Sequence, residues 1–173
     1  MKNLTSIILI SVIAFSCTNS HEHKAKLIPA PENGGITLPE GFSALVVADE
    51  IGKGRHIDVN SNGDIYVSLS QQKENKGIVC LRDTTGDGMA DIIEYTGQHT
   101  GTGIKLHKGY LYFGSDTAVV RYPLMEGELV PGNDWQMIAR GFPNERQHEA
   151  KPMEFDGKGN MYVNVGAPSN ACM

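Results

Sequence analysis

Three short stretches decide the fold: GDIYV at 63–67, GYLYF at 109–113 and GNMYV at 159–163. Each reads glycine, any residue, an apolar residue, tyrosine and another apolar residue, and the tyrosines are 46 and then 50 residues apart. Each glycine follows a short run that predicts a strand, and these runs are His56–Val59, Gly103–Leu106 and Pro152–Phe155. The intervening connections have the residue types that tight hairpin turns need, in Asn60–Gly63, His107–Gly109 and Asp156–Gly159. The pattern therefore predicts a repeated β-hairpin.

Other apolar runs of four to six residues alternate with glycine-rich breaks. They predict strands at Ala44–Ala48, Ile65–Leu69, Gly77–Leu81, Tyr110–Phe113, Ala118–Tyr122 and Met161–Val165. A period of about 40–50 residues with several short strands is typical of a β-propeller. We therefore expect an all-β chain with one four-stranded antiparallel blade per period. The strand before the Gly turn is expected to be the inner strand of its blade.

The length does not match a closed propeller. Two full periods and the start of a third amount to about two and a half blades, whereas closure needs at least about four. We expect a chain truncated at its C-terminus, with residues 36–173 forming a partial propeller. A small open sheet that dimerises is the alternative.

Composition narrows the possible functions. The chain has 173 residues, a 40% apolar fraction and a formal net charge of −5, without a long Lys/Arg run. This argues against a nucleic-acid binder that works by neutralising phosphates. Three cysteines are too few for a disulfide scaffold. Cys80, in an apolar run, is expected in the core. If Cys172 forms a disulfide, its partner is Cys80 or a cysteine beyond Met173, and the sequence leaves both open.

The N-terminus predicts export. Lys2 precedes the apolar run Leu4–Phe15, which is too short to span a bilayer about 30 Å thick. The run ends at Ser16-Cys17, which is similar to the lipobox of bacterial lipoproteins; a plain signal peptide is the alternative. We expect a signal peptide over 1–16, a lipid on Cys17, a flexible tether over 17–35, and a location in the periplasm or at the cell surface. Loss of Lys2 leaves 14 basic and 20 acidic residues, a net charge of −6.

The stretch from Asp83 to Glu94 fits a twelve-residue calcium loop. Glycine stands at position 6, Met89 supplies a backbone carbonyl at position 7, and side-chain oxygens stand at positions 1, 3, 5, 9 and 12, from Asp83, Thr85, Asp87, Asp91 and Glu94. Strands rather than helices are expected on either side. The alternatives are a structural calcium site and an acidic hairpin turn without metal.

Polar residues gather at 144–151, just before the third predicted inner strand. His148 has the natural pKa of a general base, and Glu145 or Glu149 could orient it. Arg146 and Lys151 could hold an anionic cofactor or substrate. His56 stands at the expected matching position of the first unit, facing the same channel. The alternatives are a solvated turn for His148 and a half-buried strand end for His56.

Several stretches together resemble the sorbosone dehydrogenase-like branch of the pyrroloquinoline-quinone (PQQ) sugar dehydrogenases, over about 135 residues. They are LPEGF (38–42), RHIDV (55–59), NGDIYVS (62–68), RDTTGDGMAD (82–91), GTGI (101–104), RQHEAKP (146–152) and DGKGNMYVNVGAPSNAC (156–172). The resemblance implies a six-bladed propeller with PQQ over its central channel, which oxidises a sugar hydroxyl or an aldehyde hydrate. It implies that His148 is the base, with Gln147 beside it.

The resemblance also implies that the main residues that hold PQQ lie in later blades, beyond Met173. The loop at 83–94 does not correspond to the calcium site next to the cofactor. Arg146, Gln147, Lys151 and His56 are the cofactor-binding candidates of this chain. A non-catalytic surface propeller that binds a glycan or a protein partner is the alternative function, and substrate and electron acceptor stay open.

Overall fold

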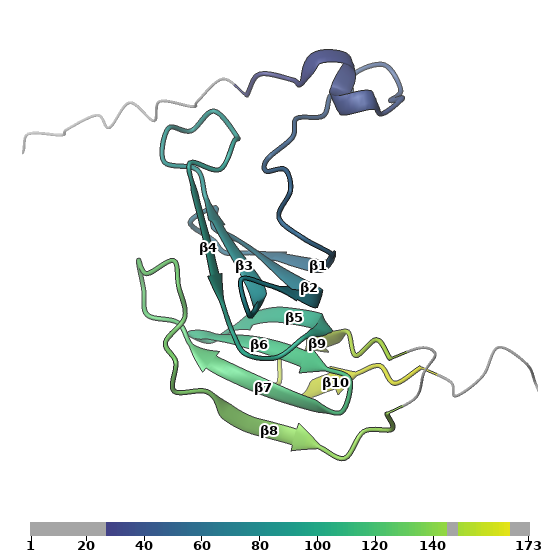
Figure 1. The fold of residues 1–173 in the computed structure, drawn as a ribbon, viewed down its shortest axis with the longest axis vertical. Helices are drawn as coiled ribbons and strands as arrows, with labels where there is room; N and C mark the ends of the chain where they lie inside the picture. Colours follow the sequence, from purple (N-terminus) through teal and green to yellow (C-terminus); the bar gives the residue numbers. More distant parts are fainter. Residues whose placement is uncertain (1–26, 145–148, 167–173) are drawn as a thin grey trace, which may run out of the picture.

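A computed structural model describes residues 27–144 and 149–166, and within them the chain forms three antiparallel β-sheets (Figure 1). One short 3₁₀ helix, η1 (Pro31–Gly35), precedes the strands. The strands are β1 (Gly54–Val59), β2 (Ile65–Lys73), β3 (Lys76–Arg82), β4 (Ile92–Thr96), β5 (Gly101–His107), β6 (Tyr110–Ser115), β7 (Ala118–Pro123), β8 (Gln136–Arg140), β9 (Met153–Phe155) and β10 (Met161–Val163).

The sheets have the predicted blade topology. The first has the order β1-β2-β3-β4, the second β5-β6-β7-β8, and β9 pairs with β10 in a hairpin. The repeated tyrosines occupy the same register position, since Tyr66 lies opposite Asp58, Tyr112 opposite Lys105 and Tyr162 opposite Glu154. The all-β prediction and the four-stranded antiparallel blades are therefore confirmed.

The repeated glycine has a backbone reason. Gly63, Gly109 and Gly159 have φ values of 93°, 75° and 89°, in the left-handed region that a side chain disfavours. Each glycine ends the turn between the inner strand and the tyrosine strand. A glycine therefore recurs wherever the chain enters a tyrosine strand.

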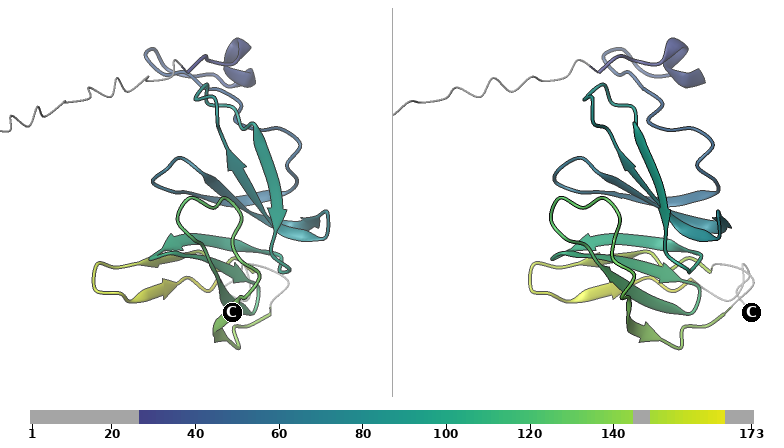
Figure 2. Two further views of the ribbon diagram at one scale, coloured as in Figure 1. Left: turned by 90° about the vertical axis from the view of Figure 1, so that its left-hand side faces the viewer. Right: turned by 60° about the vertical axis from the view of Figure 1, so that its left-hand side comes forward.

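The three inner strands lie next to one another, with β5 in contact with both β1 and β9. Figure 2 shows the β9–β10 hairpin alongside the second sheet, on the side away from the first. The first interface buries Tyr66, Ile78 and Cys80 with Ile104, Leu111, Phe113, Val120 and Tyr122. The second places Met153, Phe155, Met161 and Val163 against Tyr112 and Val119. Each sheet therefore buries apolar side chains against its neighbour, as propeller blades do.

The prediction of a strand at Ala44–Ala48 is wrong. The segment is not part of a sheet, because the first sheet already has its four strands. Val47 and Ala48 instead pack on the face of that sheet away from the second sheet, against Val67, Leu69, Val79 and Leu81. The Val47 carbonyl accepts a 2.8 Å hydrogen bond from Ala90 N in the β3–β4 loop. The apolar pattern therefore identified a segment that is partly buried, with Val46 exposed, and it predicted the pairing of the segment wrongly.

The N-terminal predictions fall largely on residues that the structure does not describe. The signal peptide at 1–16 and Cys17 lie outside the described residues. Within the expected tether, Ala30 N donates a 2.9 Å hydrogen bond to Ala44 O. No helix among the described residues is long and apolar enough to cross a membrane.

Candidate functional site

A cleft of about 370 Å³ opens where the chain enters the inner strands β1 and β5. Arg55, Thr102, Asp116 and Glu149 line it together with Ser70, Gly101 and Ala150. These residues come from the first two sheets and from the segment that leads into β9. The cleft therefore lies beside Glu149 and Ala150, the described residues of the polar segment 144–151 that line it.

A chain of hydrogen bonds beside this cleft joins the first two sheets to the segment that leads into β9. His56 N donates to Ser68 Oγ at 3.1 Å, and Ser68 Oγ donates to Thr102 O at 3.0 Å. Lys151 N then donates to Thr102 Oγ1 at 2.9 Å. Ser68 and Thr102 are buried, so water competes little with these bonds. The starts of the inner strands are thereby held at fixed positions relative to one another.

Glycines allow the third sheet to approach the second closely. A Cβ atom on Gly103 or on Gly114 would collide with the carbonyl oxygen of Lys151. Neither glycine has a positive φ, so the requirement here is space rather than backbone conformation. The Thr102 hydroxyl therefore holds the backbone of residue 151 in place, and Gly103 and Gly114 leave the space that its carbonyl oxygen occupies.

Lys151 was predicted to hold an anion, and the structure places its side chain elsewhere. The residue is only 1% exposed, and its Nζ donates a 2.8 Å hydrogen bond to the carbonyl of Glu149. It is not among the residues that line the cleft. The ammonium group orders the loop that leads into β9, and a backbone carbonyl compensates part of its desolvation.

His56 lies on β1. It is exposed and lines a shallow cleft of about 190 Å³ together with Asp58, Lys105 and Glu154. The strand register corrects the expected match between His56 and His148. Asp58, Lys105 and Glu154 lie opposite the three repeated tyrosines. His56 precedes Asp58 by two residues, so its equivalents on the other inner strands are Gly103 and Pro152. Local sequence similarity misplaced this match by four residues.

A row of alternating charges crosses the inner strands. Lys105 Nζ lies 2.9 Å from Glu154 Oε2 and 3.9 Å from Asp58 Oδ1. The hydrogen bond to Glu154 raises the pKa of Lys105, and the same bond lowers the pKa of Glu154. The second oxygen of Asp58 accepts a 2.6 Å hydrogen bond from Leu106 N. The sequence analysis missed this row, although the repeat could have indicated it, because each of the three charged residues lies opposite the repeated tyrosine of its own hairpin.

Arg55 is the further residue that sequence reasoning did not assign. Among the described residues that line the cleft it is the one basic side chain, and the carboxylates of Asp116 and Glu149 share the space. PQQ carries three carboxylates, so cations suit it and carboxylates do not. This part of the cleft therefore fits one acidic group of such a ligand, at Arg55, and the remaining charge needs cations from elsewhere.

Three predicted site residues, Arg146, Gln147 and His148, lie outside the described residues, as does Cys172. Their roles remain predictions. The described residues on either side of this segment are Asn144 and Glu149, and both line clefts near the starts of the inner strands.

The predicted calcium loop is organised by its own backbone. Asp83 accepts hydrogen bonds from Gly88 N at 2.7 Å and from Gly86 N at 2.5 Å, and these bonds lower the pKa of Asp83. Asp91 accepts from the hydroxyl and the amide of Thr84, which lower its pKa in the same way. Glu94 lies on β4.

Among the described residues no three His, Cys, Asp or Glu side chains converge as metal ligands would. The calcium site at Asp83, Thr85, Asp87, Met89, Asp91 and Glu94 stays a prediction.

Solved structures with this fold include a PQQ domain and carbohydrate-active enzymes. The chain is similar to the holo form of the PQQ domain of pyranose dehydrogenase from Coprinopsis cinerea, with a TM-score of 0.61 and 15% identity over 72% of this chain and 30% of that one. It is also similar to a calcium structure of a Trichoderma reesei carbohydrate-active enzyme of family AA12, with a TM-score of 0.60 and 15% identity over 72% and 32% of the two chains. An iodide structure of a Trichoderma reesei enzyme of family AA12 matches with a TM-score of 0.58 and 16% identity, over 78% and 37%.

The chain thus spans about a third of the length of the solved structures that it matches. No family model matches the sequence, and no curated protein matches it. At this level of identity the likeness shows the fold alone, which is that of part of a β-propeller.

Proposed function

We propose that this chain is the N-terminal part of an exported, lipid-anchored quinoprotein oxidoreductase that oxidises a sugar hydroxyl or an aldehyde hydrate. The observation that carries the proposal is the cleft at the starts of the inner strands, with Arg55 in it, on a fold shared with PQQ domains. Export and the lipid on Cys17 rest on the sequence of the first seventeen residues.

The residues of this chain have distinct parts in the proposal. Arg55 holds one carboxylate of the cofactor, and Arg146 and Gln147 contribute further contacts. The Thr102 hydroxyl and the buried Lys151 fix the segment that leads into β9. His148 takes the proton of the substrate hydroxyl, because an imidazole titrates near neutral pH. PQQ, when bound, supplies a quinone that accepts hydride.

Binding and turnover test the proposal separately. We expect PQQ to bind the complete protein in the presence of calcium, with a change in its absorbance, and we expect Arg55→Ala to weaken that binding about tenfold or more. Arg140→Ala is the matched control, since Arg140 is an exposed residue of β8. We expect His148→Ala to retain PQQ and to lose dye reduction with aldoses or sorbosone. Equal turnover by the wild type and His148→Ala would contradict the proposed base.

The alternative is a non-catalytic propeller that binds a glycan or a protein partner at the channel mouth. The two carboxylates in the cleft, Asp116 and Glu149, favour it, since they suit hydroxyl and amine donors better than an anionic cofactor. This alternative predicts ligand binding that does not depend on PQQ or calcium and is lost in Asp116→Ala.

A further inference from the structure

A second and larger cleft, of about 600 Å³, lies at the opposite ends of the same strands. Its walls are the β1–β2 turn at Asn60–Asn62, the end of β5 with the following turn at 106–110, and the start of the β7–β8 connection at 124–127. Arg55 and Thr102 lie where the chain enters β1 and β5, whereas these walls follow the ends of those strands. The second cleft is therefore separate from the candidate site.

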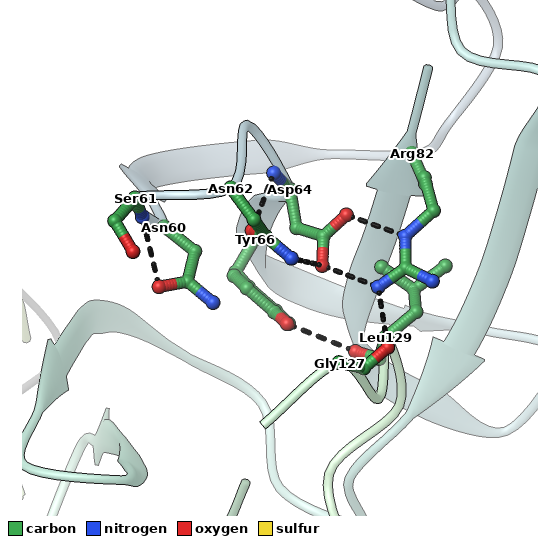
Figure 3. Close-up of polar contacts among 8 residues, drawn as sticks. All are labelled: Asn60, Ser61, Asn62, Asp64, Tyr66, Arg82, Gly127 and Leu129. Atoms are coloured by element: carbon green, nitrogen blue, oxygen red, sulfur yellow. Dashed lines mark hydrogen bonds and ion pairs between the residues drawn. The ribbon is translucent and has the colours of Figure 1, made fainter. Parts of the chain in front are cut away.

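An ion pair between Arg82 and the buried carboxylate of Asp64 fixes the walls of this cleft (Figure 3). Asp64 is 2% exposed, and Arg82 Nε and Nη2 donate to its two carboxylate oxygens at 2.7 and 2.6 Å. The Asn62 amide donates to the same carboxylate at 2.8 Å, and Arg82 Nη2 also donates to Gly127 O at 3.1 Å. The pair thus joins the β1–β2 turn to the β7–β8 connection, which are two opposing walls.

Further bonds hold the same walls. Tyr66 Oη, from the first sheet, donates to Leu129 O at 3.0 Å, and Leu124 N donates to Gly109 O at 2.8 Å. The ring of His107 stacks on that of Phe155, with ring centroids 3.9 Å apart. A cleft whose walls are held in this way loses little conformational freedom when a ligand binds.

The polar groups of the lining suit a ligand rich in hydroxyls. Asn60 uses its side-chain oxygen to accept a 2.9 Å bond from Ser61 N, and Figure 3 draws no bond from its amide nitrogen to the other residues shown. Ser61 stands beside it in the lining, whereas the His107 ring is stacked on Phe155. Amide and hydroxyl groups both donate and accept hydrogen bonds, as sugar hydroxyls do.

The remaining lining residues point to a neutral ligand. The cleft has one basic side chain, Lys108, and one acidic side chain, Glu126, so its charges balance. A phosphate or another strong anion would call for a cluster of cations. Leu106, Leu124 and the exposed Met125 add apolar surface for the C–H face of a sugar ring.

From these observations we propose that the cleft between the β1–β2 turn and the β7–β8 connection binds a neutral saccharide. The volume lies within the range of about 300–1,000 Å³ that small-molecule sites occupy, enough for an oligosaccharide unit. This site acts independently of the proposed redox chemistry, because no residue of the Arg55 cleft contributes to it.

Calorimetric titration of the full chain with cellotriose and with maltotriose, without PQQ, tests the proposal. We expect saturable binding of at least one of them. Asn60→Ala should weaken it about threefold to tenfold, as the loss of one hydrogen bond of about 0.5–1.5 kcal/mol does. Asn164→Ala is the matched control, because Asn164 is exposed and no hydrogen bond of its side chain is found among the described residues. Ser61→Trp, at an exposed turn position, should fill the cleft and abolish binding.

The possible outcomes separate this site from the other proposals. Binding that persists in Arg55→Ala and Asp116→Ala and disappears in Ser61→Trp supports the saccharide site, whatever happens to PQQ. Absence of saturable binding of both sugars overturns it. Binding that Ser61→Trp leaves intact, or binding of inorganic phosphate in the cleft that is lost in Lys108→Ala, overturns it as well.

Discussion

The second and third sheets carry the same tyrosine motif in opposite surroundings. Tyr112, on β6, is 7% exposed because the β9–β10 hairpin covers it, whereas Tyr162, on β10, is 60% exposed. Tyr66, on the first sheet, is fully buried by the second sheet. The motif is thus the same in all three sheets, and the neighbouring sheet decides whether its tyrosine is buried.

The inner strands of the three sheets show the same dependence of burial on a neighbouring sheet. Ile57, Ile104 and Met153 hold equivalent positions on the three inner strands, one residue before the residue opposite the tyrosine. Ile104 and Met153 are 5% and 8% exposed, and Ile57 is 65% exposed. The Ile57 face and the Tyr162 face are therefore the two surfaces that no neighbouring sheet covers among the described residues, and Val47 and Ala48 cover part of the first one.

The largest expected effect contrasts the two tyrosines directly. Tyr66→Ala should lower the free energy of unfolding by about 4 kcal/mol, since it empties a fully buried aromatic site. Tyr162→Ala should change it by about 0.5 kcal/mol or less, as surface substitutions do. Urea denaturation measures both values. Equal losses in the two variants would show that the tyrosines have equivalent surroundings in solution.

The ion pairs Arg82–Asp64 and Lys105–Glu154 allow the same comparison between a buried and an exposed position, in the free energy of unfolding. Arg82→Ala should cost about 3 kcal/mol, because it leaves the buried carboxylate of Asp64 without its charged partner. Lys105→Ala breaks the pair with the exposed Glu154 and should cost about 1 kcal/mol or less. The same denaturation experiment compares the two variants. A larger loss for Lys105→Ala would contradict the assignment of the buried pair.

These contrasts also show what the sequence could predict. Strands, hairpin turns and the tyrosine register follow from local patterns, because glycine conformation and apolar alternation are properties of neighbouring residues. The Asp64–Arg82 pair and the position of Arg55 in the cleft were missed, since each depends on how strands or sheets pack. The prediction of a strand at Ala44–Ala48 was wrong for the same reason. An apolar run indicates contact with the core, but whether the segment pairs with a sheet edge depends on the whole fold.

The contact between the second and third sheets predicts an intermediate effect. Gly103→Ala should destabilise the chain by about 1–3 kcal/mol, because its new Cβ meets the Lys151 carbonyl, a backbone atom that cannot rotate away. Gly157→Ala is the matched control, since a Cβ there has no neighbour within 4 Å and its φ is not positive. Hydrogen exchange of the β9–β10 amides measures the effect locally. Unchanged protection in Gly103→Ala would refute the close approach.

The smallest effect concerns pH. Burial of the His99 ring, which lies edge-on to Trp135 and 3.0 Å from the Tyr122 hydroxyl, lowers the pKa of His99 below 6.5. The unfolded chain therefore binds more protons than the folded chain as the pH falls through 6.5, and stability declines in that range.

Denaturation midpoints between pH 7.5 and 5 should fall in the wild type and fall less in His99→Gln. Asp64 affects the pH dependence of stability only at lower pH, because its hydrogen bonds with Arg82 hold the pKa of Asp64 below 3.8. Identical slopes in the wild type and His99→Gln would exclude the histidine as the source.

The thiol of Cys80 makes the first interface a natural reporter of opening. Cys80 is fully buried between the first two sheets, and burial raises its pKa to about 12. At pH 7 only about one such thiol in 10⁵ is ionised, and thiolate is the form that reacts with alkylating agents. Labelling of Cys80 therefore has to wait until the two sheets separate. The rate at which Cys80 is labelled therefore measures how often the first two sheets separate around its sulfur atom.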